Sequence, residues 1–525
     1  MPVLAKPSME ESDSSEIDSD PDEDNLLITS EQELRDLPAD TTTSAQFDKQ
    51  EKRTRVWPAT YVCTVVAFGF LLFGFTMGFN SPVLSSLKSK KGYTSLRRTL
   101  DQDLFNFSFL IGTTIITPFS GYLTDRLGRK LSIILCCIPY TFGWLIVVLT
   151  VSTDGPAFRP LLYIGRFVVG VAAGWSASCF NVYVAEVSPS RYRGAFIVLN
   201  GFMLTVGLFI AQLAGVYTSY YWLANITLAF TLIFILFAIT IKETPQWLII
   251  QGRRLEAVKT LRWLNGPHCN VGEEIQKITA GISSQKLSLL EVIKQFRNKS
   301  VYHPVILACF VMCFLQLSGI TVVIFNVEDI FKQASVKSPG LTSSFATGGV
   351  QIVSSFIGIF AVSLFSRRKL LMISYSVASL SHAVMGVYEY LNNEPYCHPP
   401  GDPQCKSDLY PLAIVCVALF IASYSAGIAA VSFLLLAEVV PLRVRGVGIG
   451  LSFVVNGMMS AISAGLFDSY EILVKPWGAF WTFSTTCFIA VLFVAIFIPE
   501  TKGKPLEEIE RIFDTRRQQR HYSSK

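Results

Sequence analysis

Two copies of one charged stretch, Ala185–Gly194 (A-E-V-S-P-S-R-Y-R-G) and Ala437–Gly446 (A-E-V-V-P-L-R-V-R-G), indicate how this chain is organised. Each copy follows a long apolar run, and each contains a glutamate, a proline and two arginines. Each ends on a glycine that opens the next apolar run, and about half of the 525-residue chain separates the two copies. A repeat of this size between apolar runs predicts a membrane protein built from two parallel halves.

The composition supports a membrane protein, because 51% of the residues are hydrophobic, only 16% are charged, and the mean hydropathy is +0.44. The apolar residues occur in runs of about 20, the length that crosses a bilayer as a helix. We therefore predict an all-α membrane protein of twelve transmembrane helices in two six-helix halves. The expected spans are 57–79, 104–124, 131–151, 160–184, 195–217, 220–241, 304–331, 341–365, 370–391, 411–436, 446–468 and 477–498.

Polar segments divide the chain into five parts. Residues 1–55 are acidic and nearly free of aromatics, so we expect a disordered cytoplasmic tail. Residues 56–241 and 304–498 would form the two six-helix bundles, and the polar stretch 242–303 between them a cytoplasmic linker with short surface helices. Residues 499–525 would form a second cytoplasmic tail.

Basic residues follow alternate spans, which places those loops and both termini in the cytoplasm. Examples are the loops with Arg126 and Arg129, with Arg367 and Arg368, and with Arg443. The loop 88–98 disagrees, because it holds five basic residues on the other side, and we let the majority decide. A net charge of +5 with this distribution indicates membrane topology and gives no reason to expect nucleic-acid binding.

We expect no enzyme, cofactor or metal site. Most of the eleven cysteines lie in apolar runs, no C-x-x-C pair occurs, and the five histidines are scattered. No phosphate-binding loop or nucleophile–base pair stands out. The expected partners are the lipid bilayer and a small solute, and nothing in the sequence requires more than a monomer.

Further motifs recur near the ends of the spans. Gly121–Lys130 (G-Y-L-T-D-R-L-G-R-K) follows the second span, and Ser363–Arg368 (S-L-F-S-R-R) follows the eighth. Gly165–Gly174 opens the fourth span with G-R-F, and Pro499–Gly503 (P-E-T-K-G) ends the twelfth. Together with the first repeat, these motifs resemble the sugar-porter branch of the major facilitator superfamily, the facilitative hexose transporters, over about residues 58–513. The resemblance implies the major facilitator fold.

The charged motifs suggest a gate. Carboxylates and guanidiniums at the cytoplasmic span ends can pair across the halves when that side is closed, and inward opening would break these pairs. The alternative is ordinary surface ion pairs, each of little energetic value. The recurrence of acids and bases in both halves favours the gate. The second half has Ser363 where the first has Asp125, so we expect the ion pairing of its part of the gate to be weaker. The candidate gating residues are Asp125, Arg126, Arg129, Arg166, Glu186, Arg193, Glu243, Arg367, Arg368, Glu438 and Arg445.

A sugar is a neutral polyol, so its site needs amides, hydroxyls and an aromatic face. The resemblance places the family's double-glutamine signature on residues 315–321, where Gln316 is the glutamine that remains. The alternative for these amides is hydrogen bonding between helices. The candidate substrate-binding residues are Gln316, Thr321, Gln351, Phe433 and Asn456.

The chain departs from the family's sugar site at several positions, among them Thr321, which stands where the family has an asparagine. Gly201 and Leu315 stand where the family has glutamines, and Phe433 and Gly457 stand where it has tryptophans. At about 1 kcal/mol per hydrogen bond, the loss of two amides would lower the affinity for glucose by roughly tens- to hundreds-fold. A different sugar or polyol, or another small organic solute, therefore remains open as the substrate.

The first span bears on energy coupling. Proton-driven relatives have an aspartate there, whereas this chain has Gly74-Phe75-Thr76, and a threonine cannot carry the proton. We therefore expect facilitated diffusion of a hexose or related sugar by alternating access. Glu328 and Asp329 keep proton-coupled symport open as an alternative. A non-transporting sensor is a third possibility, which the paired charged motifs disfavour.

Two further features concern location. Asp22, Leu26 and Leu27 fit the acidic dileucine pattern D-x-x-x-L-L, which clathrin adaptors bind, and the tail resembles that of the intracellular subgroup of the family. We expect an endosomal or lysosomal membrane, with the plasma membrane as the alternative. Cys397 and Cys405 are a candidate disulfide, because their loop would face an oxidising lumen or the exterior.

Overall fold

The computed structural model describes the helical body of the chain, namely residues 56–89, 96, 99–150, 155–189, 192–266, 271–283, 296–297, 299–334, 336–393, 410–441 and 444–502. Twelve helices or helix groups in this part are long and apolar enough to cross a membrane, which confirms the expected fold class. Several predicted positions lie outside the described residues or have side chains that are not described. These are Asp22, Leu26, Leu27, Cys397, Cys405, Arg193 and Arg445.

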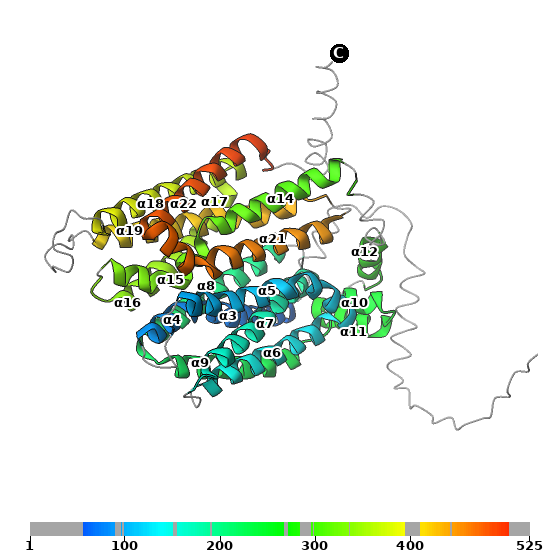
Figure 1. Cartoon of the computed structure of the whole chain (residues 1–525). Coiled ribbons are helices and arrows are strands. Elements are labelled where there is room, and N and C mark those ends of the chain that lie inside the picture. Colours follow the sequence, from blue (N-terminus) through cyan, green and yellow to red (C-terminus); the bar gives the residue numbers. More distant parts are fainter. Residues whose placement is uncertain are drawn as a thin grey trace, which may run out of the picture.

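The first six spans form one bundle, drawn in blue to green in the lower part of Figure 1. Their aromatic and aliphatic side chains build a continuous core that includes Phe75, Phe109, Trp144 and Phe180. The helices are α3 (Val56–Gly78) with α4 (Asn80–Ser89), α5 (Thr99–Leu127), α6 (Arg129–Leu149), α7 (Phe158–Val187), α8 (Arg193–Tyr217) and α9 (Tyr220–Thr240).

Glycines set the spacing of α5 and α7. A Cβ atom at Gly170 would lie 2.1 Å from the carbonyl oxygen of Phe109, and one at Gly174 would lie 2.5 Å from that of Thr113. Small residues four apart allow two helix backbones to approach closely in a membrane. The glycines of the G-R-F motif therefore serve helix packing.

The last six spans form the second bundle, with its own core around Met312, Tyr375, Phe420 and Leu435. Its helices are α14 (Lys299–Leu317) with α15 (Ile320–Gln333), α16 (Pro339–Ser344), η3 (Phe345–Gly349) and α17 (Val350–Leu364), α18 (Arg367–Asn393), α19 (Tyr410–Ser423), η5 (Tyr424–Ala429) and α20 (Ala430–Val439), α21 (Arg445–Gly465) and α22 (Phe467–Phe497).

Three spans of the second bundle are interrupted inside a stretch that the sequence predicted as one continuous run. Helix α22 is also broken, at Lys475 with a φ of 63°, just before the predicted twelfth span 477–498. The seventh breaks at Ser318 and Gly319, where Gly319 has a left-handed φ of 89°. The eighth and tenth contain the π-helical turns η3 and η5. The apolar pattern continues through these positions, so hydropathy alone does not reveal the breaks.

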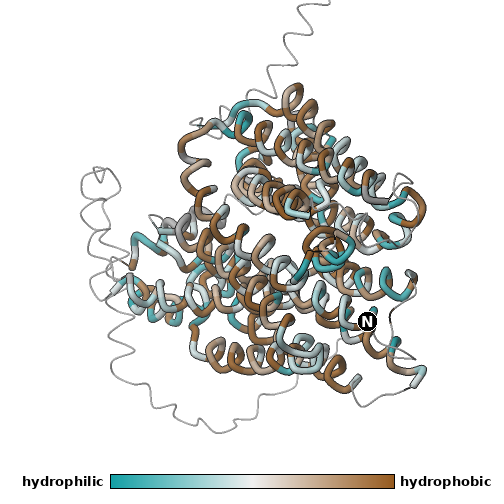
Figure 2. Tube along the Cα trace, turned by 90° about the vertical axis from the view of Figure 1, so that its left-hand side faces the viewer, coloured by the Kyte–Doolittle hydropathy of each residue, from teal (hydrophilic) through white to brown (hydrophobic). Residues whose placement is uncertain are grey.

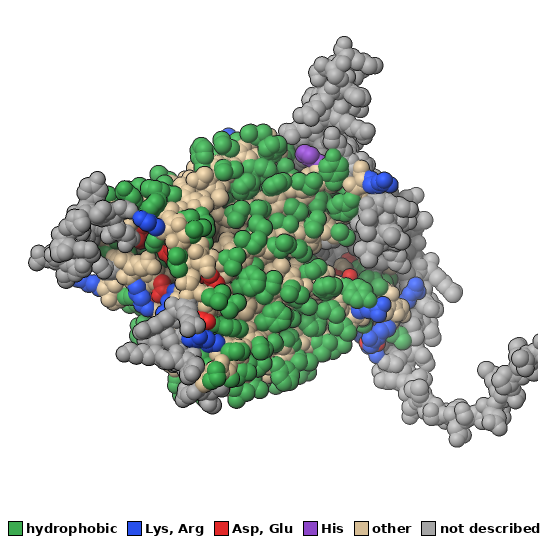
Figure 3. Space-filling model, viewed as in Figure 1, with side chains coloured by type: hydrophobic (Ala, Val, Ile, Leu, Met, Phe, Trp, Pro, Cys, Tyr) green, Lys and Arg blue, Asp and Glu red, His purple; other side chains and the backbone are tan. Residues whose placement is uncertain are grey.

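The charges lie at the two ends of the helices, on either side of an apolar belt (Figure 3). We call the end with Arg129, Glu186, Arg367 and Glu438 the motif face. The short helices α10 (Pro245–Ile250), α11 (Arg254–Asn265) and α12 (Val271–Ser283) also lie there, at the right of Figure 1. The opposite face, seen in Figure 2, is the end with α4, α15 and α16.

Candidate functional site

At the motif face, the first half contains a buried ion-pair cluster, which we call the first-half cluster. The Arg129 guanidinium donates to the Glu186 carboxylate at 2.9–3.1 Å and also pairs with Asp125 at 2.9 Å. The Thr244 hydroxyl donates to Glu186 at 2.6 Å, and Glu243 accepts the backbone N–H of Arg129 at 3.0 Å. The cluster ties α6, α7 and the end of α9 together.

The second half repeats this arrangement in what we call the second-half cluster. Arg367 pairs with Glu438, but at 3.8 Å, a longer distance than in the first half. The Thr501 hydroxyl donates to Glu438 at 2.6 Å, and Glu500 accepts the backbone N–H groups of Arg367 at 3.0 Å and Arg368 at 3.3 Å. The duplicated motifs therefore build two equivalent structures.

Both clusters differ from the sequence-based expectation, which paired these residues across the halves. In the structure, the Arg129–Glu186 pair joins α6 to α7, and the Arg367–Glu438 pair joins α18 to α20. The reason is that the partners stand at the ends of neighbouring helices of the same bundle. The predicted Arg126 lies over the ring of Tyr122, 5.2 Å from its centroid. A gating role for these residues stays a prediction.

The expected position of Arg166 was wrong. It lies in the same helix as Glu186, but about 30 Å away at the usual rise of ~1.5 Å per residue, so it is not at the motif face. Its guanidinium is fully buried, donates to Asn80 and lies 4.6 Å from the centroid of the Phe109 ring. The charge therefore binds α4, α5 and α7 together inside the first half.

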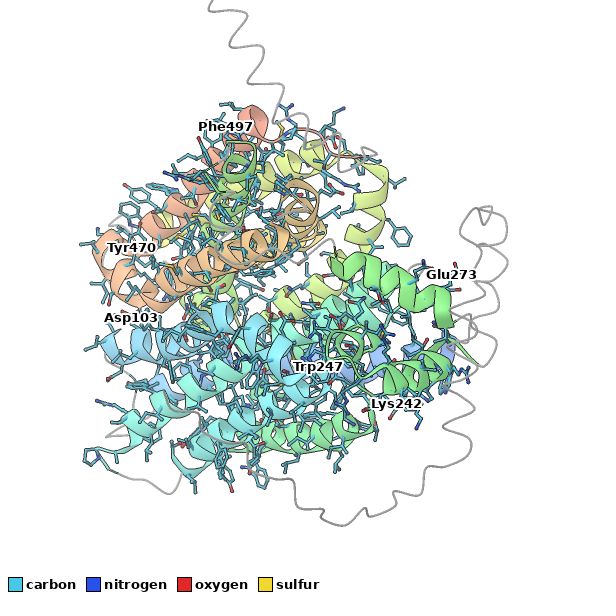
Figure 4. All side chains as sticks on the ribbon, turned by 90° about the vertical axis from the view of Figure 1, so that its right-hand side faces the viewer. Asp103, Lys242, Trp247, Glu273, Tyr470 and Phe497 are labelled. Carbon is cyan, nitrogen blue, oxygen red and sulfur yellow. The ribbon has the colours of Figure 1, made fainter. Side chains whose placement is uncertain are left out.

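At the opposite face, charged groups join the two halves, and we call this group the interdomain cluster. The Lys88 ammonium of the first half contacts Asp329 at 2.9 Å and Asp468 at 3.5 Å in the second. The carboxylate of Asp103 on α5 accepts the backbone N–H groups of Asp468 at 3.1 Å and Ser469 at 3.2 Å. Figure 4 labels Asp103 beside Tyr470 in the first turns of α22. An acid at a helix N-terminus is favourable because it satisfies free N–H groups.

Two further side-chain contacts also join the halves. The Ser85 hydroxyl donates to Glu328 at 2.7 Å, and the Thr347 hydroxyl on η3 donates to the side-chain oxygen of Gln212 on α8 at 2.7 Å. The sequence-based list of site residues missed the interdomain cluster. A signal was present, because Lys88 belongs to the basic loop that disagreed with the topology rule.

Near the break in the seventh span, three predicted substrate residues form one network. Thr321 donates to the Oε1 atom of Gln316 at 2.8 Å, and Gln316 donates to Asn456 on α21 at 3.2 Å. The Ser460 hydroxyl, which the sequence analysis missed, donates to Thr321 at 3.2 Å. All four groups are neutral donors or acceptors, which suits a polyol.

The other two predicted substrate residues lie on different helices. Gln351 is buried on α17, and its Oε1 atom accepts no hydrogen bond from the described residues. Phe433 lies on α20 with 45% of its surface exposed, and its ring stacks on Phe453 at a centroid distance of 6.0 Å. The structure thus brings together three of the five predicted residues.

Two glycines that depart from the family pattern have opposite surroundings. A Cβ atom at Gly457 on α21 would lie 2.7 Å from the Oγ1 atom of Thr114 on α5, in the other half. A Cβ atom at Gly201 would meet nothing within 4 Å. Gly457 therefore allows close contact between the halves, whereas Gly201 leaves space for a larger side chain.

Comparisons with known proteins agree with this architecture. Residues 62–513 match the family model described as "Sugar (and other) transporter". The solved structure "Inward open conformation of the xylose transporter XylE from E. coli" superposes with a TM-score of 0.71 at 19% identity, over 86% of this chain and 99% of that one. This similarity shows the major facilitator fold.

Curated relatives match over most of their length. The mouse protein "Solute carrier family 2, facilitated glucose transporter member 8" is 30% identical over 88% of this chain and 95% of its own length. The "Facilitated trehalose transporter Tret1" of Bombyx mori is 28% identical over 91% of this chain and 93% of its own length. The chain therefore belongs to the sugar transporter family of the major facilitator superfamily.

Proposed function

We propose that this sugar transporter carries a hexose or a related polyol down its gradient by alternating access. The main supporting observation is the distribution of charged contacts. The interdomain cluster joins the halves at the opposite face, whereas the motif-face clusters join helices within each half. We infer a carrier in the state that is closed at the opposite face, with the motif face free to open.

The motif face is the cytoplasmic face in this proposal, and both termini lie on that side. The support is the basic loops, since positively charged loops remain in the cytoplasm. The basic loop 88–98 disagreed with this orientation. Its Lys88 is compatible with it, because the ammonium forms ion pairs with Asp329 and Asp468. Labelling of an engineered cysteine near either terminus in sealed cells tests the orientation, and labelling from outside would reverse it.

Gln316, Thr321 and Asn456 would hold the sugar hydroxyls, since their mutual hydrogen bonds can be exchanged for hydrogen bonds to a polyol. Gln351 would add an acceptor from α17. We expect Gln316→Ala to raise the KM about ten-fold, with Gln333→Ala at the end of α15 as the control. An unchanged KM would remove Gln316 from the site.

Gly201 offers a direct test of substrate choice. The space beside it should accept the glutamine that the family has at this position. We expect Gly201→Gln to lower the KM for glucose, while Gly201→Leu, of similar volume without an amide, does not. Equal effects of both variants would show that volume, rather than a hydrogen bond, matters at this position.

Uniport is favoured over proton symport by the first span. Thr76 is fully buried there and donates its hydroxyl to the Leu72 carbonyl at 2.9 Å. We expect proteoliposomes to equilibrate labelled hexoses without accumulation, with or without a pH gradient. Accumulation driven by the pH gradient would establish symport, and failure to move or bind any sugar of a broad panel would refute the proposal.

We also propose that the dileucine motif directs the protein to endosomes or lysosomes through a clathrin adaptor, and that Cys397 and Cys405 form a disulfide. The support is the sequence pattern, which lies outside the described residues. Leu26→Ala with Leu27→Ala should move the protein to the cell surface. Leu34→Ala with Leu37→Ala, in the same tail, is the control. An unchanged distribution of the first variant would contradict the sorting claim.

A further inference from the structure

The break in the seventh span is held by side chains from two other helices. Helix α14 ends at Leu317 and α15 begins at Ile320, with Gly319 left-handed between them. The Thr486 hydroxyl on α22 lies 2.9 Å from the Leu317 carbonyl and also 2.9 Å from the Phe483 carbonyl of its own helix, so the two acceptors share its single proton. The Nε2 atom of His382 on α18 lies 3.0 Å from the Ser318 carbonyl. Carbonyls at the end of a helix need such partners because the regular ladder stops there.

The hydrogen bond to the Ser318 carbonyl determines which ring nitrogen of His382 carries a proton. A carbonyl oxygen can only accept, so Nε2 must carry the proton in this contact. The imidazole is 3% exposed, and the rings of Phe420 and Phe483 lie at centroid distances of 4.2 and 5.7 Å. A buried polar ring among phenylalanines is costly unless its hydrogen bond compensates for the lost water. The contact with Ser318 supplies this compensation.

The same break lies between two residues of the hydrogen-bonded network of Gln316, Thr321, Asn456 and Ser460, which we call the polar network. Gln316 precedes it, Thr321 follows it, and their side chains are hydrogen-bonded at 2.8 Å. The angle between α14 and α15 therefore sets the distance between these two groups. Any side chain that fixes the backbone of Leu317 and Ser318 also fixes the arrangement of the polar network.

We propose that His382 and Thr486 are positioning residues that hold the bend of the seventh span and thereby the spacing of Gln316 and Thr321. For substrate binding this inference rests on the proposed function, in which those two side chains contact the sugar. The bend itself does not depend on that function. Neither His382 nor Thr486 needs to touch the sugar.

Matched variants separate the hydrogen bonds from the packing. His382→Phe keeps a ring in the aromatic surroundings and removes the donor, while His382→Gln keeps an N–H donor. Thr486→Val removes the hydroxyl with little change in shape. Thr485→Val is its control. Both hydroxyls contact a carbonyl of α22 itself, at Trp481 and at Phe483, but that of Thr486 also reaches Leu317 in the seventh span.

We expect His382→Phe and Thr486→Val each to raise the KM for the transported sugar about five-fold, the change that corresponds to ~1 kcal/mol for one lost hydrogen bond. His382→Gln should recover part of the affinity, and Thr485→Val should match the wild type. Adding His382→Phe to Gln316→Ala should cost less than the product of the two single effects, because both act on one network. Unchanged KM values, or fully multiplicative effects, would overturn the role in substrate binding.

Amide hydrogen exchange tests the bend without transport. In purified protein, His382→Phe and Thr486→Val should speed the exchange of residues 317–323, and Thr485→Val should not. Unchanged exchange in the first two variants would overturn the inference. If the wild type moves no sugar, the proposed function is refuted. The positioning role would still be supported in that case if amide exchange is faster in these two variants.

Discussion

The motif face and the opposite face use the same kinds of residues in different ways. At the motif face, Arg129 with Glu186 and Arg367 with Glu438 connect helices of one half. At the opposite face, Lys88 and Asp103 connect one half to the other. The first arrangement stabilises each bundle in every state, whereas the second stabilises only the state in which that face is closed.

The difference shows why an ion pair alone does not identify a gate. A pair within a bundle can stay intact while two rigid bundles rotate, so breaking it should cost mainly stability. A pair between bundles must break in each cycle, so weakening it should shift the populations of the states. Four experiments follow, in order of decreasing effect, and two of them include a matched comparison variant.

The largest effect is expected at the first-half cluster. Arg129→Met would leave the Glu186 carboxylate, whose side chain is 11% exposed, without its main partner. Removal of one member of a buried pair costs ~3–5 kcal/mol, so the melting temperature in detergent should fall strongly. Arg367→Met is the comparison, and we expect a smaller fall because its pair is longer, at 3.8 Å. Equal losses would show that the two clusters are energetically equivalent.

The second effect concerns the interdomain cluster. Asp103→Ala would remove the acceptor of two N–H groups on α22 and should weaken closure of the opposite face by about 2 kcal/mol, or about 30-fold in the state ratio. Cysteine accessibility from that side should rise, with stability little changed.

Asp101→Ala is the matched control for this experiment. Asp101 lies on the same helix but pairs with Arg159 at 3.2 Å within the first half. Its loss should lower stability without changing the accessibility of the opposite face. If both variants change accessibility alike, the distinction between contacts within and between the halves is wrong.

A third, smaller effect is expected from Glu438→Gln. The amide can still accept from Thr501, which donates to Glu438 at 2.6 Å, while the ion pair with Arg367 is lost. We expect a loss of stability of about 1 kcal/mol. A pair confined to one half predicts a transport rate near that of the wild type, whereas the gating role expected from the sequence predicts slower transport, so the measured rate decides between the two.

The smallest effect is a pH dependence at Glu500. Its partial burial acts to raise the pKa, but hydrogen bonds from the backbone N–H groups of Lys502 and Arg367 outweigh this and hold the pKa below its ordinary value. A carboxylate with a lowered pKa adds stability above the pKa of the unfolded chain and loses it as the pH falls through the folded pKa. Because Glu500 is only partly buried, solvent screening keeps the contribution below about 0.5 kcal/mol.

Melting temperatures at different pH values measure this contribution. Glu500→Gln should be slightly less stable than the wild type near pH 7. The difference should begin to shrink as the pH falls below about 4.3, the ordinary pKa of a glutamate, and vanish once the folded carboxylate is protonated. A difference that grows on acidification would show the opposite sign and contradict the assignment.

Much of the fold could be predicted from the sequence, because a bilayer imposes length and polarity on every span. The twelve spans follow from apolar runs, and the two halves follow from the repeated motifs around Glu186 and Glu438. The substrate candidates Gln316, Thr321 and Asn456 were found together because the family resemblance fixes their positions in the spans. A glutamine or asparagine in such a run is also uncommon enough to be noticed.

The partners of the charged residues could not be predicted in this way. Arg166 occurs in the same kind of motif as Arg129, yet one lies deep within the first half and the other at the motif face. The break at Gly319 and its contact with His382 are equally hidden, since the apolar pattern continues through them.

The sequence by itself thus determined the membrane-spanning helices, their number and the equivalence of the halves, because hydropathy and repetition are properties of consecutive residues. Only the tertiary structure decided which charges stabilise a bundle and which join the bundles. The physical reason is that an ion pair depends on atoms a few ångströms apart, and Lys88 and Asp468 meet although most of the chain lies between them.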